Sequence, residues 1–324
     1  MIELSVRQGL NEAMAEEMRR DNDVFLMGEE VGQYDGAYKV TQGLLSEFGP
    51  RRVIDTPITE AGFAGVGVGA AFMGLKPIVE FMTFNFALQA MDHLINSAAK
   101  TRYMSAGRVT CPIVFRGPNG SASRVAAQHS QDFSSWFAQV PGLKVLAPYS
   151  ASDAKGLLKA AIRDPDPVIF LENELLYGKI FKLEEEVTEP EVIGVARVVH
   201  PGSDATIISF SRGVEWSLEA ADTMEQSGTS CEVIDLRSLR PLDMKTIVKS
   251  VKKTNRLLIV DGGWPAMGVA AEIAFRVQNE IFDYLDAPIL RVTSEEVPLP
   301  YAANLEQMAL PNKQKILSAI ESMQ

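Results

Sequence analysis

Cysteine and long apolar runs are scarce in this chain of 324 residues. Its two cysteines, Cys111 and Cys231, are too few and too isolated for a disulfide framework or a zinc site, so we expect structural thiols. No run of eighteen apolar residues occurs, and no membrane span is expected. The start lacks a signal-peptide core and an arginine-rich presequence. The expected location is cytoplasmic, or the mitochondrial matrix if this is a processed form.

Several functional motifs are missing as well. The chain has no Gly-x-x-x-x-Gly-Lys-Ser/Thr phosphate loop and no carboxylate spacing typical of a self-contained magnesium-diphosphate site. It has no Gly-x-Ser-x-Gly elbow, so a Ser/His/Asp hydrolase is unsupported. The net charge of -11 disfavours nucleic acid and favours a basic protein partner. Any phosphorylated cofactor would be held largely by another chain.

The composition, 46% hydrophobic and 23% charged, is typical of a globular protein, and the length allows two domains. Apolar strand-like runs alternate with amphipathic helical ones, which predicts an α/β fold with a parallel sheet covered on both faces. We expect a first domain over 1–180, a linker over 181–199 and a second, smaller α/β domain over 200–324.

The expected elements follow from this alternation. Strands are predicted at 24–27, 52–55, 76–80, 111–116, 144–147 and 167–172, with helices at 89–103 and 152–163. In the second domain, strands are predicted at 205–210, 231–236, 256–260 and 289–292, with helices at 214–226, 243–252 and 269–280.

Glu60 is the first candidate for chemistry. Thr59 before it is a suitable N-cap, and a first-turn carboxylate beside small residues can be held close to a ligand. The alternative is a solvent-facing glutamate that complements the helix dipole. Residues 65–70 match the G-x-G-x-x-G/A spacing, but they lie too far beyond the predicted strand for a dinucleotide-binding turn. The glycines at 62, 65 and 69 instead share one helix face that another backbone can approach.

A second candidate follows the strand predicted at 111–116. The polar loop 117–123 lies where open α/β sheets place ligands, and His129 comes just after it, so His129 is an acid/base candidate or a hydrogen-bonded loop histidine. His93 and His200 are expected to be structural. The run 81–86 offers aromatic and thioether surface for a flat ring, with core packing as the alternative.

Nine stretches of the chain, taken together, resemble the beta subunits of the pyruvate dehydrogenase decarboxylating component, a thiamine-diphosphate enzyme of the 2-oxoacid dehydrogenase complexes. The resemblance runs nearly end to end and is far more specific than any single motif. It includes GEEV (28–31), QYDGAYKV (33–40), DTPI (55–58), EFMTFNF (80–86), INSAAKT (95–101), FRGPNG (115–120), AAQHSQ (126–131), LENEL (171–175) and GGWP (262–265).

The resemblance implies an overall architecture and a set of partners. It implies two three-layer α/β/α domains with mostly parallel sheets, a transketolase-type pyrimidine-binding domain followed by a transketolase C-terminal domain. It also implies an alpha subunit that holds Mg²⁺ and diphosphate through a Gly-Asp-Gly motif, which this chain lacks. We therefore expect an α2β2 heterotetramer that binds thiamine diphosphate between its subunits, acts on pyruvate and delivers acetyl groups to a lipoyl acetyltransferase.

Site residues are also implied by the resemblance. Glu60 corresponds to the glutamate that hydrogen-bonds the ring nitrogen of the aminopyrimidine and promotes ylide formation. Phe86 matches the aromatic residue beside that ring, and Met82 and Gln89 line the same region. Glu29 matches an acidic residue that helps to relay protons between sites.

Further positions are implied outside the cofactor site. His129 resembles the histidine that serves reductive acetylation of the lipoyl group, and Asp286 matches an acidic residue of the surface that docks the acyltransferase. Mitochondrial members bind a structural potassium ion, a hard cation suited to oxygen ligands. The matching positions here are Ile113, Ala161, Ile162, Asp164 and Asp166, where Asp166 replaces the expected asparagine.

Three alternatives stay open. Beta subunits of branched-chain 2-oxoacid and acetoin dehydrogenases would share the cofactor residues but differ in pocket size. The blocks FMTFNF and PNG favour pyruvate. A non-catalytic subunit that only stabilises an enzyme is the third alternative.

Overall fold

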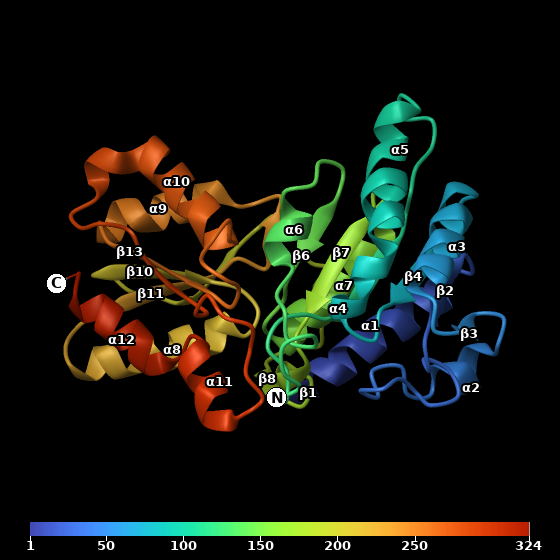
Figure 1. The fold of residues 1–324 in the computed structure, drawn as a ribbon, viewed down its shortest axis with the longest axis horizontal. Coiled ribbons are helices and arrows are strands. Elements are labelled where there is room, and N and C mark those ends of the chain that lie inside the picture. Colours follow the sequence, from blue (N-terminus) through green and yellow to red (C-terminus); the bar gives the residue numbers. More distant parts are fainter. Residues whose placement is uncertain (324) are drawn as a thin grey trace. The chain divides into compact units, whose positions relative to one another are not determined.

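The computed structural model describes residues 1–323, which divide into two compact units (Figure 1). Unit 1 comprises Met1–Asn119 and Trp136–Ile193. Unit 2 comprises Gly120–Ser135 and the chain from Gly194 onward. Residues 120–135, expected in the first domain, therefore cluster with the second unit. The reason is visible within unit 2, where Arg212 Nη1 donates to Ser121 Oγ over 3.4 Å.

Unit 1 is built on a parallel sheet. Its strands lie side by side in the order β6-β7-β5-β4-β2-β3, and each neighbouring pair is parallel. They are β2 (Val24–Gly28), β3 (Val53–Asp55), β4 (Lys76–Glu80), β5 (Val114–Pro118), β6 (Lys144–Leu146) and β7 (Val168–Glu172). All six predicted strands of this region are confirmed. Strands buried on both faces give near-continuous apolar runs, which is why the sequence marks them clearly.

The sequence patterns did not predict every helix of unit 1, and the first helix is one of those missed. α1 (Val6–Arg20) begins with a capping box in which Ser5 and Gln8 exchange hydrogen bonds. The other helical segments are α2 (Leu44–Phe48), α3 (Glu60–Phe72), α4 (Phe84–Ala87), η1 (Leu88–Ala90), η2 (His93–Ala98), α5 (Ala99–Met104), α6 (Ser134–Ala138), α7 (Ala151–Arg163) and η3 (Glu174–Leu176). The first two residues of α6 are counted with unit 2.

The helix predicted at 89–103 is wrong as a single element. η1 is a 3₁₀ turn, η2 is a π-helical turn, and only α5 is α-helical. The amide of Ala99 donates to the Leu94 carbonyl, a five-residue step typical of a π-turn. A pattern with a period of 3.6 residues does not reveal such a change of winding.

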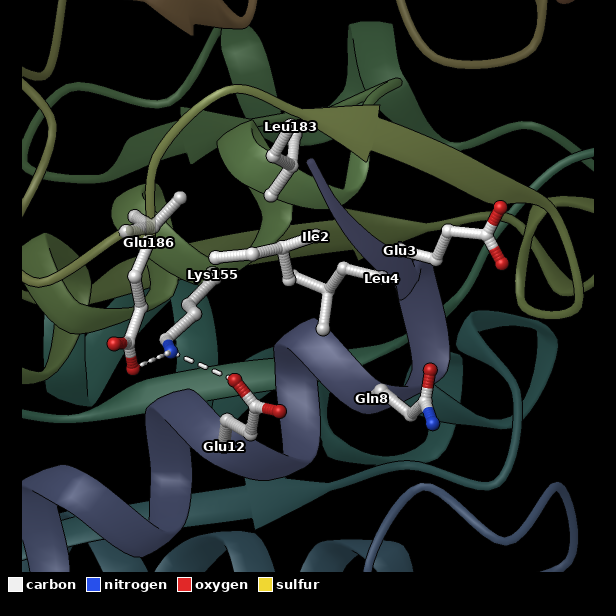
Figure 2. Close-up of a pocket in the computed structure, with 9 residues that line it drawn as sticks. Ile2, Glu3, Leu4, Gln8, Glu12, Lys155, Leu183 and Glu186 are labelled. Carbon is white, nitrogen blue, oxygen red and sulfur yellow. Dashed lines mark hydrogen bonds and ion pairs between the residues drawn. The ribbon is translucent and has the colours of Figure 1, made fainter.

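α1 is tied to α7 by ion pairs. Lys155, only 1% exposed, lies 2.7 Å from Glu12 and 2.8 Å from Glu16. Arg163 on the last turn of α7 lies 2.6 Å from Glu17. Figure 2 shows Lys155 between Glu12 and Glu186. These residues lie at a pocket with a volume of 280 Å³. Both helices line this pocket, together with the paired strands β1 (Ile2–Ser5) and β8 (Ile180–Leu183). None of the site residues expected from the sequence lines this pocket.

Unit 2 is a second α/β layer structure. Its sheet has the order β14-β13-β10-β11-β9, and only β9 at the edge is antiparallel to its neighbour. Figure 1 shows α8 and α12 on one face of this sheet and α9 and α10 on the other. The strands are β9 (Arg197–His200), β10 (Ala205–Ser209), β11 (Cys231–Asp235), β13 (Leu257–Asp261) and β14 (Leu290–Thr293). The predicted strands and helices of this region are confirmed.

The helices of unit 2 bury a shared core against this sheet. Ile207, Val233 and Leu258 of the strands are fully buried, and they pack in one cluster with Ala220 and Ile316 of the helices. The helical segments are α8 (Gly213–Gln226), α9 (Met244–Thr254), α10 (Val269–Ile281), η4 (Phe282–Tyr284), α11 (Ala303–Ala309) and α12 (Lys313–Glu321), and a short strand β12 (Ser238–Arg240) follows β11.

The expected linker 181–199 is partly structured. β8 continues to Leu183, and β9 begins at Arg197. Strand pairing therefore extends into both ends of a segment whose acidic run and Pro190 predicted an irregular link. Among the described residues, no helix combines the length and the apolar character needed to cross a membrane.

Candidate active site

The candidate site of unit 1 lies where parallel strands end. Glu29 comes directly after β2, and Glu60 is the first residue of α3, which follows β3. The segment 81–86 comes directly after β4. Since the carboxyl ends of parallel strands meet at one edge of a sheet, these segments share the edge at which open α/β sheets place their ligands.

Glu29 and Glu60 form a buried carboxyl pair. Glu29 is 4% exposed and Glu60 is 3% exposed. Oε1 of Glu29 has no hydrogen-bond partner. Burial, followed by the negative charge of Glu60, raises the pKa of Glu29 to about 7. A carboxyl group with this proton affinity can both hold and release a proton near neutral pH, which suits it to proton transfer.

The surroundings of Glu60 differ in part from the expectation. Thr59 is at the N-cap position, but its side chain makes no capping hydrogen bond. The Thr59 hydroxyl instead lies against Gly62, where an added Cβ would come within 2.9 Å of it. Glu60 is buried even without a partner chain, so the alternative of a solvent-facing glutamate is wrong. The site thus holds a carboxyl group in the first turn of a helix, shielded from water.

The aromatic run after β4 divides between core and site. Phe81 and Phe84 are fully buried, and the ring of Phe81 stacks on Phe115 with 6.0 Å between centroids. Phe86 and Met82 are half-buried. The core-packing alternative therefore holds for Phe81 and Phe84, while Phe86 and Met82 keep surface that a ligand can contact. Gln89 is exposed.

A buried ion cluster next to this edge was not found from the sequence. Arg116 on β5 donates from Nε and Nη2 to both oxygens of Glu172 at 2.6 Å, and it also pairs with Glu80. The hydroxyl of Tyr177 donates to Glu172 over 2.6 Å. Burial raises the pKa of Glu80, with the charge of Arg116 opposing it. The cluster joins the last residues of β4 and β7 to the middle of β5, and the signal for it was a charged residue at the end of each predicted apolar strand.

Comparison with known proteins identifies the family. Residues 2–179 match the family model of the transketolase pyrimidine-binding domain, and residues 194–316 match that of the transketolase C-terminal domain. The chain is 60% identical to the pyruvate dehydrogenase E1 component subunit beta of Rickettsia bellii, with 99% of each chain covered. It is 60% identical to that of Rhizobium meliloti, with 100% of this chain and 70% of the relative covered.

The chain belongs to the family of pyruvate dehydrogenase E1 component beta subunits. A mitochondrial member, subunit beta-1 of Arabidopsis thaliana, is 61% identical, with 98% of this chain and 88% of the relative covered. The family expected from the nine sequence stretches is therefore confirmed.

Solved structures confirm the fold. A split-gene transketolase, described as an inactive beta4 tetramer, has a TM-score of 0.80 at 18% identity and covers 99% of this chain and 98% of its own. The transketolase of Campylobacter jejuni has a TM-score of 0.73 at 16% identity, with 99% of this chain and 47% of that chain covered. At these identities the likeness shows the architecture, two transketolase-type α/β domains with mostly parallel sheets.

The three histidines of the chain have different surroundings. His129 is exposed and lies in the segment of unit 2 from Gly120 to Ser135, whereas Glu60 belongs to unit 1. His93 packs its ring over Gly65, where an added Cβ would come within 3.0 Å of it. Nδ1 of His200 lies 2.9 Å from the Cys231 carbonyl oxygen. His93 thus packs on α3 and His200 contacts a backbone carbonyl, while His129 is the most exposed of the three.

The five positions matched to a potassium site fit a cation only through main-chain oxygens. Lys144 Nζ lies 2.6 Å from the Asp164 carboxylate and 3.4 Å from that of Asp166, and Arg102 also pairs with Asp166. These carboxylates are therefore already neutralised. The carbonyls of Ile113 and Ala161 each accept one amide hydrogen bond, which leaves them a second lone pair for a hard cation. Within residues 1–323, no cluster of three or more His, Cys, Asp or Glu side chains could hold a metal ion.

Asp286 lies on the surface of unit 2. Its side chain is exposed, and its amide donates to the Asn255 carbonyl over 2.9 Å. Asp283 and Phe282, which is 61% exposed, lie close to it in the chain. The segment therefore presents negative charge beside an apolar ring.

Proposed function

We propose that this chain is the beta subunit of a pyruvate dehydrogenase. With an alpha subunit in an α2β2 heterotetramer, it catalyses thiamine-diphosphate-dependent oxidative decarboxylation of pyruvate. The acetyl group passes to the lipoyl group of dihydrolipoyl acetyltransferase, which leads to acetyl-CoA. The observation that carries the proposal is the buried pair of Glu29 and Glu60 at the sheet edge of a chain about 60% identical to such subunits over its whole length.

The residues of unit 1 fit one half of a thiamine diphosphate site. When bound, this cofactor supplies a carbon nucleophile and an electron sink for decarboxylation. Glu60, shielded from water, would hydrogen-bond a ring nitrogen of the aminopyrimidine and hold a proton at its carboxyl oxygen. Phe86 and Met82 would pack against the ring and exclude water. Gln89 would line the outer rim, and Glu29 would exchange protons with Glu60.

Other parts of the assembly lie outside this chain or this site. The magnesium ion and the diphosphate would be held by the alpha subunit. A potassium ion would be bound by main-chain oxygens of residues 113, 161, 162, 164 and 166. Asp286 would dock the basic binding domain of the acetyltransferase, a role supported by its exposure and by the net charge of -11.

The role of Glu60 is tested by Glu60→Gln in the assembled α2β2 enzyme. Glutamine cannot exchange a proton with the ring, so decarboxylation with an artificial electron acceptor is expected to fall at least about 100-fold. Glu47→Gln is the matched control, because Glu47 pairs with Arg19 on the surface and its loss should leave the rate unchanged. Full activity of Glu60→Gln would refute the assignment. Loss of cofactor binding in Glu60→Ala with assembly intact would exclude a non-catalytic subunit.

The role of His129 is tested by separating the two half-reactions. His129→Ala should lower acetylation of the lipoyl domain about 100-fold, since a general acid is lost, while decarboxylation with an artificial acceptor is largely kept. The neighbouring Gln128→Ala, equally exposed, is the control and should keep both rates. An equal loss of both reactions in His129→Ala would remove its special role.

The substrate is tested by comparing rates for pyruvate and for 3-methyl-2-oxobutanoate with the purified assembly. A higher kcat/KM for pyruvate is expected. A preference for the branched substrate would assign the chain to a branched-chain 2-oxoacid dehydrogenase, and activity with acetoin to an acetoin dehydrogenase.

A further inference from the structure

The segment that carries Glu29, the loop between β2 and α2 (residues 29–43), has an unusual backbone. Glu30, Asp35 and Lys39 have φ angles of 59°, 61° and 60°, in the left-handed region that residues other than glycine seldom adopt. Such conformations persist only where surrounding contacts impose them. The loop is therefore held by specific bonds, and those bonds decide where Glu29 lies.

Asp55 ties this loop to β3, while the bonds from the Gly36 amide to the Glu30 carbonyl and from the Thr41 hydroxyl to the Val31 carbonyl hold it internally. One oxygen of the Asp55 carboxylate accepts the amide of Gly32 at 2.6 Å, and the other accepts the amide of Gln33 at 2.9 Å. Gly32 has no side chain to obstruct these two bonds, since an added Cβ would come within 3.0 Å of the Asp55 carboxylate. Hydrogen bonds from amides to a charged carboxylate are among the stronger ones in proteins.

Asp55 also occupies a place between the two carboxyl groups of the site. It is the last residue of β3, five positions before Glu60, and β3 pairs with β2 so that Gly28 and Asp55 are register partners. The amide of Thr56 donates to the Gly28 carbonyl over 2.9 Å. One side chain thus connects the loop behind Glu29 with the segment that leads to Glu60.

We infer that Asp55 is a positioning residue of the proposed active site, which fixes the backbone at Gly32 and Gln33 and thereby holds Glu29 in its buried place beside Glu60. The inference rests on the proposed function. Oε1 of Glu29 has no hydrogen bond of its own, so no bond to that atom anchors the carboxyl group. Its place depends instead on the backbone of the loop, to which Asp55 contributes the bonds from β3.

The consequence for chemistry concerns proton affinity. The pKa of Glu29 is raised by burial and by the charge of Glu60, the first residue of α3. A loosened loop would let water reach Glu29 and would move it away from Glu60. The pKa would then fall from about 7 toward its ordinary value of 4.5.

The experiment uses Asp55→Asn in the assembled α2β2 enzyme. The side chain of asparagine has one acceptor oxygen, so it can accept only one of the two backbone amides. Its NH₂ group would face the N–H of the other, and that hydrogen bond would be lost. We expect kcat/KM for pyruvate to fall about tenfold and the limb of its pH profile near 7 to move to lower pH. Amide hydrogen exchange in a peptide covering residues 28–40 should become faster. Asp35→Asn is the matched control, because Asp35 accepts the amide of Gly43 at the far end of the same loop, 3.0 Å away. It should leave the pH limb in place.

A double-mutant cycle tests whether Asp55 acts through Glu29. In a Glu29→Gln background, Asp55→Asn should change neither the pH profile nor the dissociation constant of thiamine diphosphate measured by fluorescence quenching. Equal effects in both backgrounds would overturn the inference, as would unchanged hydrogen exchange in Asp55→Asn. If Asp55→Asn does not assemble, Gly32→Ala displaces the same contact with Asp55 intact, and it should shift the pH limb likewise. Absence of pyruvate decarboxylation in the wild-type assembly would refute the proposed function, a distinct outcome.

Discussion

Buried carboxyl groups with raised proton affinity occur in both units, two examples being Glu29 and Asp261. Glu29 belongs to the candidate site, and Asp261 ends β13 in unit 2. Asp261 accepts the amides of Gly263 at 2.8 Å and Ala270 at 3.1 Å, and so it closes the turn before α10. Burial and the charge of Asp132 raise its pKa to about 6. The same group therefore shapes a loop and makes the stability of unit 2 depend on pH.

Asp261→Asn is predicted to remove that pH dependence. Because the folded pKa of about 6 exceeds the ordinary 3.8, the folded state binds more protons between these values, and stability is lost as pH rises through this window. The contribution of Asp261 to this loss is about 3 kcal/mol over the window and is missing in the variant, whereas the contribution of Glu29 remains. Denaturant melts of both proteins at pH 4 and pH 7 measure it.

The control for this prediction has the opposite sign. Asp204 is exposed, and its pKa is lowered by hydrogen bonds from the Ser230 amide and the Ser203 hydroxyl. Its contribution to stability is therefore lost as pH falls, and Asp204→Asn should remove a dependence of that direction. The free energy of unfolding of the wild type, relative to that of Asp261→Asn, should be lower at pH 7 than at pH 4. If it is not, the assignment to Asp261 is contradicted.

At this scale the sequence located some functional residues but not their properties. Glu60 stood out because a first-turn carboxylate beside small residues is a local pattern. Arg116 did not, because its partners Glu80 and Glu172 lie on other strands. The burial of Glu29 was likewise invisible, since it depends on which segments cover it after folding.

At the scale of elements, α3 shows how glycine positions in one helix differ. An added Cβ at Gly67 would come within 2.8 Å of Val79 on β4, whereas one at Gly69 would meet nothing within 4 Å. The helix therefore approaches the sheet through Gly67, which is not among the three glycines expected on a close-packing face. The face with glycines at 62, 65 and 69 does not pack on the sheet. Gly62 and Gly69 are exposed, and the ring of His93 covers Gly65.

Substitution by alanine is predicted to act oppositely at these two glycines. Gly69→Ala should stabilise the chain by about 0.5–1 kcal/mol, because alanine loses less backbone entropy in a helix. Gly67→Ala should destabilise it by about 1–3 kcal/mol, since the added methyl group must displace Val79 or the helix. Chemical denaturation of the purified chain measures both. Equal stabilisation at the two sites would mean that α3 does not pack on β4 at Gly67.

Element prediction succeeded where burial is regular and failed where the backbone is irregular. The parallel strands were predicted because both of their faces are buried. The segment 89–103 was predicted as one helix, but it winds as 3₁₀, π and α turns in succession. α1 was missed although Ser5 and Gln8 have the spacing of a capping box.

At the scale of the whole molecule, unit 1 has a group of apolar side chains around α3 that are exposed to solvent in the isolated chain. Ile58, Val66 and Met73, just before, within and just after α3, are 83%, 63% and 85% exposed. Large side chains of this kind, grouped around one helix with exposed glycines between them, are typical of surfaces that a partner covers. They support the hypothesis that this face of α3 packs against another subunit.

Val66→Asp is predicted to prevent assembly without unfolding the chain. A buried, unpaired carboxylate would oppose association, whereas on the free chain the same charge faces water. Size-exclusion chromatography with the alpha subunit should show loss of the proposed α2β2 species, with an unchanged Tm of the chain alone. Val192→Asp is the control, because Val192 is 65% exposed in the segment between β8 and β9 and is not part of α3. Normal assembly of Val66→Asp would rule out this face as the interface.

The sequence by itself determined the family, the two α/β domains with parallel sheets and the candidacy of Glu60, because motif order and apolar periodicity are carried by neighbouring residues. Only the tertiary structure decided the proton affinity of Glu29, the bonds from Asp55 to the loop behind it and the pairing of Arg116. These properties depend on residues 23 positions apart at Asp55 and Gly32 and 56 positions apart at Arg116 and Glu172. Burial and Coulomb interaction are set by distance in space, which no local pattern encodes.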